Sequence, residues 1–234
     1  TRVPVGRYTS LQVFPFTFRE FLSAAKREVL LEELVEFKNS LNISPSLHLE
    51  LLSQYDKYLQ VGGLPAVVMA ALSGQDYKLV RRNIVLSQEE DFLRKTSIGD
   101  RKLFQSALRG VANRLGSPSK FTHLADSYAD AKNICSRLEA WKLIYEIEQK
   151  GISSTTAFHP KRYLYDIGIA EDSRNMPFPE LSILETLNAA LRTQLGGVIE
   201  NAVLLSLLPH HMGNIDISSW KKASDNPAEV DFIW

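Results

Sequence analysis

The 234-residue sequence has one cysteine and no net charge, because 27 basic side chains balance 27 acidic ones. A single cysteine excludes a disulfide framework and a cysteine-rich zinc site, and we expect Cys135 to be a small buried core residue. The longest apolar run, residues 64–72, is too short to cross a bilayer, and the printed sequence opens with no signal-peptide pattern. We therefore expect a soluble, cytoplasmic protein without a membrane partner.

The sequence also lacks the short motifs of common catalytic sites. No glycine-rich loop ends in Gly-Lys-Ser/Thr, and there is no G-x-S-x-G, H-E-x-x-H or C-x-x-C pattern. These residues alone do not form a phosphate cradle of the Walker type. We therefore expect this chain by itself to bind no cofactor and not to hydrolyse ATP.

The N-terminal part has the signals of consecutive helices. A capping box at Thr17 and Glu20 precedes apolar residues at helical spacing as far as Phe37. Further helices are predicted from Pro45 to about residue 60, across 65–72 and across 75–97, with Gly62-Gly63 ending the first of these three. Residues 17–98 are therefore predicted to be a helical subdomain, preceded by a strand or loop over residues 1–16.

Residues 99–160 show a different order of elements. Helices are predicted across 101–115, 119–126 and 127–142, and alternating strand patterns follow at 143–148 and 161–165. Three helices followed by a two-stranded ribbon are typical of a winged helix.

The basic side chains of the sequence are concentrated in this unit. Residues 101–165 hold 11 Lys and Arg against 5 Asp and Glu, and the rest of the chain holds 16 against 22. Contact with double-stranded DNA is predicted, mostly at phosphates, for Lys120, Lys132, Asn133, Arg137, Lys161 and Arg162. The alternative is a solvated surface, or a winged helix that binds a protein partner or a second copy, because Asp130 and Glu139 lie on the same helix.

The last segment predicts an α/β unit with two candidate acids. A helix across 181–193, a break at Gly196-Gly197 and a second helix precede strands at 215–220 and 228–234. Glu200 interrupts an apolar helix, and Asp231 lies within a strand. If they converge, they are candidate catalytic and metal ligands for Mg²⁺, which prefers oxygen and activates water against a phosphodiester. The alternative is a surface glutamate and an unrelated aspartate.

Several stretches together resemble one family, a group of bacterial AAA+-type ATPases whose C-terminal half is known only as a domain of unknown function. The stretches that carry the resemblance, in chain order, are VGR at 5–7, FPFTFREFL at 14–22, GGLP at 62–65, KRYLYDIG at 161–168, GGVIEN at 196–201 and EVDF at 229–232. The resemblance covers nearly the whole chain and implies that it is the C-terminal part of a longer protein.

The resemblance implies a mainly α fold with a smaller α/β part. Residues 1–16 would end an ATPase core, 17–98 would form its helical lid, 99–160 a winged helix, and 161–234 an incomplete restriction-endonuclease-like domain. Glu200 and Asp231 match the helix acid and the central-strand acid of such a domain, but the following strand with a second acid and a lysine is missing. Arg7 would sense nucleotide phosphate or form a salt bridge with the lid.

The function implied for the parent protein is ATP- and Mg²⁺-dependent. It would couple ATP binding to engagement of DNA or of a partner protein. The alternative is a regulatory winged-helix module that binds proteins, without DNA binding or catalysis.

Overall fold

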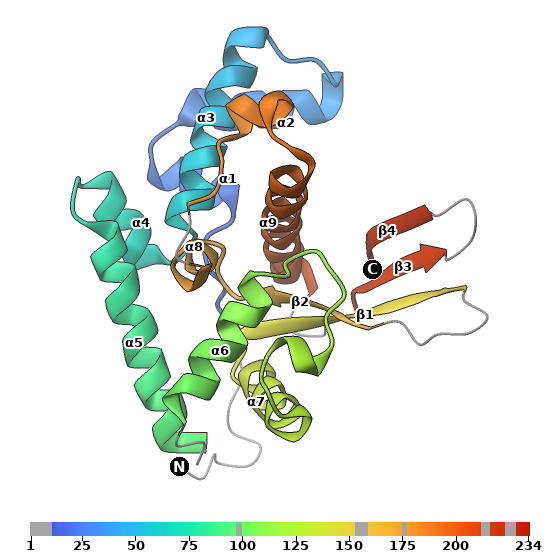
Figure 1. Ribbon diagram of the computed structural model, residues 1–234. Helices are drawn as coiled ribbons and strands as arrows, with labels where there is room; N and C mark the ends of the chain where they lie inside the picture. The colour runs from blue at the N-terminus through green and yellow to red at the C-terminus, as the bar shows by residue number, and fades with distance from the viewer. Residues whose placement is uncertain (1–10, 97–99, 153–158, 175–176, 212–215, 223–227) are drawn as a thin grey trace.

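The computed structural model describes residues 11–96, 100–152, 159–174, 177–211, 216–222 and 228–234. The α-helices are α1 (Phe18–Ala24), α2 (Glu28–Ser40), α3 (Pro45–Val61), α4 (Pro65–Leu72), α5 (Tyr77–Thr96), α6 (Arg101–Ala112), α7 (Tyr128–Ala140), α8 (Gly168–Arg174) and α9 (Ala189–Leu207). Short 3₁₀ helices are η1 (Phe121–His123), η2 (Leu181–Thr186) and η3 (Leu208–His211), and the strands are β1 (Ile144–Ile152), β2 (Lys161–Leu164), β3 (Ser218–Lys222) and β4 (Ala228–Ile233). The expectation of a mainly α fold with a smaller α/β part is confirmed (Figure 1).

The helices of the N-terminal part begin and end largely where local signals place them. Thr17 and Glu20 form the predicted capping box, and the Ser44 hydroxyl accepts a hydrogen bond from the Leu47 N–H before Pro45. The single helix predicted from Thr17 to Phe37 is wrong, because the helix is interrupted between Ala24 and Glu28 and forms α1 and α2. Lys26 has a φ of 53° there, a left-handed conformation that no helix continues through.

The unit that follows has its elements in the predicted order. Helices α6, η1 and α7 lead into an antiparallel pair of β1 and β2, in which Ile144 faces Leu164 and Ile147 faces Lys161. The predicted boundary between residues 160 and 161 therefore falls inside this ribbon. One face of α7 is buried against the unit and carries Ala131, Ile134, Cys135 and Leu138, as expected for Cys135.

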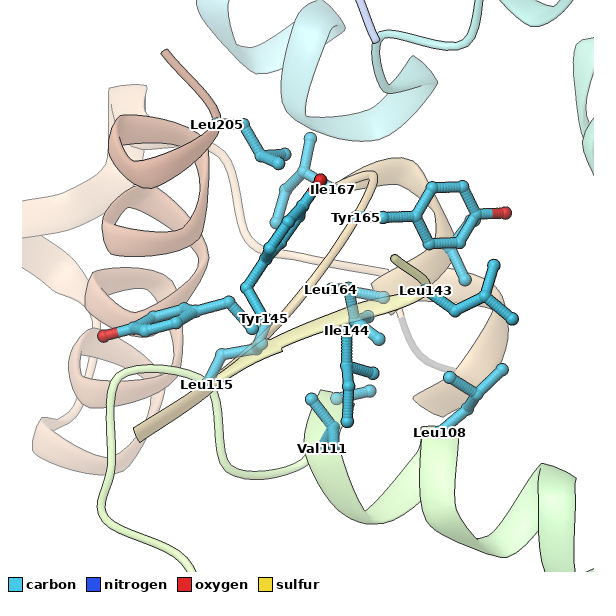
Figure 2. Packing of buried hydrophobic residues seen from close by; sticks show 14 of the residues in the cluster. Leu108, Val111, Leu115, Leu143, Ile144, Tyr145, Leu164, Tyr165, Ile167 and Leu205 are labelled. Carbon is cyan, nitrogen blue, oxygen red and sulfur yellow. The ribbon is translucent and has the colours of Figure 1, made fainter. Parts of the chain in front are cut away.

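The sheet has the order β2-β1-β3-β4, so β1 and β3 are its inner strands. The first half of β1 pairs with β2, while its second half pairs in parallel with β3, and β4 is antiparallel to β3. Figure 2 shows β1 and β2 between α6 and α9, where Leu108 and Val111 of α6 meet the strands from one side and Leu205 of α9 from the other. The main core is shared by the N-terminal helices, by the unit from α6 to β2, which we call the winged unit, and by the C-terminal segment.

Helix α9 differs from the expected pair of helices. The predicted break at Gly196-Gly197 is wrong, since both glycines lie inside one helix from Ala189 to Leu207, and residues 181–186 form the separate η2. The glycines instead allow close packing: a Cβ on Gly197 would lie 2.1 Å from the Leu115 carbonyl oxygen. A glycine pair in a sequence suggests the end of a helix. Here Gly197 instead lies within the helix, where the absence of a side chain allows the contact with Leu115.

Substitutions at the two adjacent glycines provide a matched test of this contact. Gly197→Ala is expected to destabilise the protein by roughly 1–3 kcal/mol, because the methyl group would overlap the loop carbonyl. Gly196→Ala has nothing within 4 Å and is expected to stabilise the helix by about 0.5–1 kcal/mol. Urea unfolding of both variants measures the difference, and equal effects at the two positions would contradict the packing described.

Candidate functional site

Glu200 and Asp231 converge, and a lysine lies between them. The Lys161 Nζ is 2.9 Å from Glu200 Oε1, 2.9 Å from Asp231 Oδ1 and 2.8 Å from Glu229 Oε1. The Tyr163 hydroxyl donates a hydrogen bond to the same Glu200 oxygen. These five residues are called the acid–lysine cluster below.

The cluster is assembled by three elements that are far apart in the sequence. Lys161 and Tyr163 are alternate residues of β2, and Glu229 and Asp231 are alternate residues of β4, so each pair lies on one face of its strand. Glu200 is contributed by α9. A Cβ on Gly116 would lie 2.6 Å from Glu200 Oε2, so the loop after α6 covers this carboxylate closely.

Burial and ion pairing shift the pKa values of the charged groups in this cluster in opposite directions. Burial raises the pKa of Glu200 by more than the hydrogen bonds from Tyr163 and Lys161 lower it. Burial alone would lower the pKa of Lys161, but hydrogen bonds to Glu229, Glu200 and Asp231 outweigh it and raise that pKa. Burial also opposes ionisation of Glu229, but hydrogen bonds from Lys161 and Lys221 leave its pKa lowered. The Lys161 ammonium is therefore charged at neutral pH.

The cluster does not fit the magnesium site for which Glu200 and Asp231 were candidate ligands. The Lys161 ammonium already occupies the point at which the carboxylates meet, and it is 1% exposed. Within the described ranges, no group of three or more acidic, histidine or cysteine side chains is placed to hold a metal ion. We therefore derive no metal-dependent step from Glu200 and Asp231.

Lys161 and Arg162 are inside the protein, although the sequence analysis placed them at a DNA surface. Arg162 is 2% exposed, and its Nη1 donates to the Ser119 carbonyl oxygen at 2.7 Å while its Nη2 is 2.6 Å from Glu146. The two cations hold the ribbon to neighbouring segments. The alternating strand pattern of residues 161–165 did not reveal this, because all four residues of β2 are buried.

The other four predicted DNA contacts are exposed: Lys120, Lys132, Asn133 and Arg137. The last three lie on the solvent side of α7, together with Ala129 and Ser136, opposite the face that packs against the unit. We call this exposed face of α7, together with Lys120, the α7 surface.

A basic cluster adjoins this surface at η1. The Nδ1 of His123 accepts a hydrogen bond from the Lys120 N–H at 3.2 Å. Partial burial, and then the positive charges of Arg114, Lys120 and His159, lower the pKa of His123. Arg114 and His159 are both exposed. Neither was among the predicted contacts, because Arg114 precedes η1 and α7 in the sequence and His159 follows them.

A second buried site joins three of the stretches that carry the family resemblance. Asp166 is fully buried, and it accepts hydrogen bonds from the Gly63 N–H at 2.7 Å and the Gly168 N–H at 3.0 Å. Gly62 has a φ of 84°, and a Cβ there would lie 2.3 Å from Asp166 Oδ1. The Phe16 N–H in turn donates to the Gly63 carbonyl at 2.7 Å. We call this contact of the glycine turn with Asp166 the turn–aspartate junction.

Arg81 strengthens the same junction from α5. Its side chain is fully buried, it binds both carboxylate oxygens of Asp172 at 2.8 Å, and it donates to the Gln60 carbonyl at 2.5 Å. A bidentate arginine pair fixes both distance and orientation. In the sequence an arginine followed by a second arginine in a polar helix indicates a solvated face, so no local signal pointed to Arg81. Arg7 lies outside the described residues.

Substitution of Asp166 is expected to change the pH dependence of stability. Burial raises its pKa from 3.8 to about 6, against the opposing effects of Gly63, Arg81, Gly168 and Ile169. Because the folded protein then binds the proton more tightly than the unfolded chain, this group's stabilisation is complete below about pH 4 and is lost as the pH rises through about 6.

Asp166→Asn removes this titration and places an amide donor against a backbone N–H. The variant is expected to lose roughly 1–3 kcal/mol at low pH, and its deficit relative to the wild type should shrink between pH 4 and 7. Urea unfolding of both proteins at several pH values measures this difference in the free energy of unfolding. A deficit that grows as the pH rises would show that the Asp166 pKa is lowered instead.

Removal of Lys161 tests whether the acid–lysine cluster stabilises the fold. Lys161→Met keeps a long side chain but leaves Glu200 facing two other carboxylates, and we expect a loss of roughly 1.5–3 kcal/mol. Lys221→Met is the matched control, since Lys221 also pairs with Glu229 but its side chain is 36% exposed, and the substitution should cost about 1 kcal/mol or less. Equal losses in urea unfolding would refute a special role for the buried lysine.

Comparison with known proteins identifies one family. A family model described as a domain of unknown function (DUF8612) matches residues 52–177, from α3 to the end of α8. No curated protein and no solved structure matches the chain. In the part of the chain that the structure describes, no helix has the length and apolar character to cross a membrane. The matched residues make up more than half of the chain, which therefore belongs to the DUF8612 family.

Proposed function

We propose that this chain is a DNA-binding region of a larger bacterial AAA+-type ATPase, and that the α7 surface contacts the phosphate backbone of duplex DNA. The observation that carries the proposal is the exposure of α7. This helix packs by one face alone and presents Lys132, Asn133 and Arg137 to solvent. A helix held in this way, after two shorter helical elements and before a ribbon, has the form that enters a major groove.

The charge around α7 supports contact with phosphate. Lys120 and the basic cluster at η1 adjoin the N-terminal half of the helix. Lys120, Tyr128 and His159 line a cavity of about 300 Å³ in this region. Lysine and arginine side chains that neutralise phosphates provide most of the sequence-independent affinity for DNA. Lys161 and Arg162 are buried and take no part in the proposed contact.

The ATPase part of the proposal rests on the resemblance of the motifs. The turn–aspartate junction supports it, because Asp166 joins the glycine turn of the helical subdomain to the segment that follows the ribbon. A movement of the helical subdomain caused by ATP in the parent protein would therefore be transmitted directly to the winged unit. ATP and Mg²⁺ would bind in the core of the parent protein and not in this chain.

The proposed DNA contact is tested by its salt dependence. Binding of a fluorescent duplex of about 20 base pairs, followed by anisotropy, should weaken steeply between about 50 and 200 mM salt. The double variant Lys132→Ala, Arg137→Ala should bind more weakly and reduce the slope of log K against log salt by about two. Lys38→Ala, in the last turn of α2, is the matched control and should bind as the wild type does.

Two outcomes would contradict the proposal. Wild-type binding that is absent or insensitive to salt would remove DNA as the partner, as would a double variant with an unchanged slope. Recovery of a specific protein partner through the α7 surface, without any effect of DNA, would favour the protein-binding alternative. The acidic residues Asp130 and Glu139, both exposed on α7, are the feature that favours this alternative.

A further inference from the structure

An open cavity of about 480 Å³ lies where α5, α6 and α8 meet, away from the α7 surface and the acid–lysine cluster. Its apolar lining comes from Val85, Leu86, Phe104, Leu108 and Ile169. Figure 1 shows α5 and α6 meeting at their lower ends and diverging upward, with α8 next to the upper end of α6. Most of the rest of its lining is polar or charged, and cavities of this size hold small molecules.

The acidic side chains at this cavity already have cationic partners. Lys78 Nζ donates to Glu171 Oε1 at 3.1 Å, and Arg81 binds Asp172 in a bidentate pair. Glu89 pairs with the Arg101 Nε at 3.0 Å and accepts a hydrogen bond from Gln105. Each of these three carboxylates therefore has a cationic partner within the protein.

Two arginines at the cavity are in the opposite situation. Arg82 projects from α5 and Arg109 from α6, both are exposed, and neither forms an ion pair with a carboxylate among the described residues. Each guanidinium has five N–H donors in a planar arrangement that matches a carboxylate or a phosphate. The cavity thus combines an apolar part of its wall with two cations that are available for an anion.

We propose that this cavity binds a small amphipathic anion, with its apolar body against Phe104 and Leu108 and its carboxylate or phosphate group paired with Arg82 and Arg109. The proposal is independent of DNA binding. Such a ligand would contact α5 of the helical subdomain and α6 of the winged unit at once. Because it would bind only when α5 and α6 are in place, the ligand would also raise the free energy of unfolding of the protein.

The test uses 2-naphthyl phosphate as the probe, since it combines an aromatic body with a phosphate. Its binding to the purified chain is measured by calorimetry, beside 2-naphthol, which lacks the charge, and inorganic phosphate, which lacks the body. We expect 2-naphthyl phosphate to bind at least about tenfold more tightly than either. Absence of binding at millimolar probe, or equal binding of 2-naphthol, would overturn the proposal.

Two variants locate the site. Arg82→Gln with Arg109→Gln should weaken 2-naphthyl phosphate binding by about tenfold or more, whereas Arg19→Gln, exposed on α1 and outside the cavity, should leave it unchanged. Leu86→Trp should block the probe by filling the cavity while keeping both arginines, and circular dichroism verifies that each variant folds. Binding that survives both cavity variants but is lost in Lys132→Ala, Arg137→Ala would place the probe at the α7 surface and refute the cavity site.

Discussion

The hydrogen bonds made by residues 161–168 connect all the main parts of the described structure. Lys161 and Tyr163 bind Glu200 of α9, and Leu164 exchanges two hydrogen bonds with the Asn201 side chain, at 2.9 and 3.0 Å. Arg162 holds the segment before η1, and Asp166 holds the glycine turn of the helical subdomain. Because successive strand residues point to opposite faces, one short strand can make contacts in several directions.

Several of the separate sequence stretches that carry the resemblance meet in this arrangement. The stretches around Phe16, Gly63 and Asp166 meet in the turn–aspartate junction, and those around Glu200 and Asp231 meet at Lys161. Each buried polar group there has a specific partner, which fixes one arrangement of the elements. A parent ATPase would thus have a rigid connection between its helical subdomain and the unit that we propose to bind DNA.

Local features could be predicted from the sequence because neighbouring residues determine them. The capping box at Thr17, the helix start at Pro45 and the turn at Gly62 are examples, and the convergence of Glu200 with Asp231 was anticipated as one alternative. Features set by distant contacts could not be predicted: Gly197 packs against Leu115, and Lys161 is drawn inward by acids 39 and 70 residues away. The identity of a glycine or a lysine in the sequence does not indicate which distant residue it will contact in the folded protein.

The central claim is that the segment 161–168 joins the helical subdomain and the winged unit into one cooperative structure. Native-state hydrogen exchange at the Gly63 and Leu164 amides measures this coupling most directly. The Gly63 N–H donates to Asp166 and links the helical subdomain to the segment, whereas the Leu164 N–H donates to the Asn201 side chain of α9. The account predicts that both amides exchange only by global unfolding, with the same free energy of opening. Exchange of the Gly63 amide at a much lower free energy than that of Leu164 would show that the two parts separate independently and would contradict the claim.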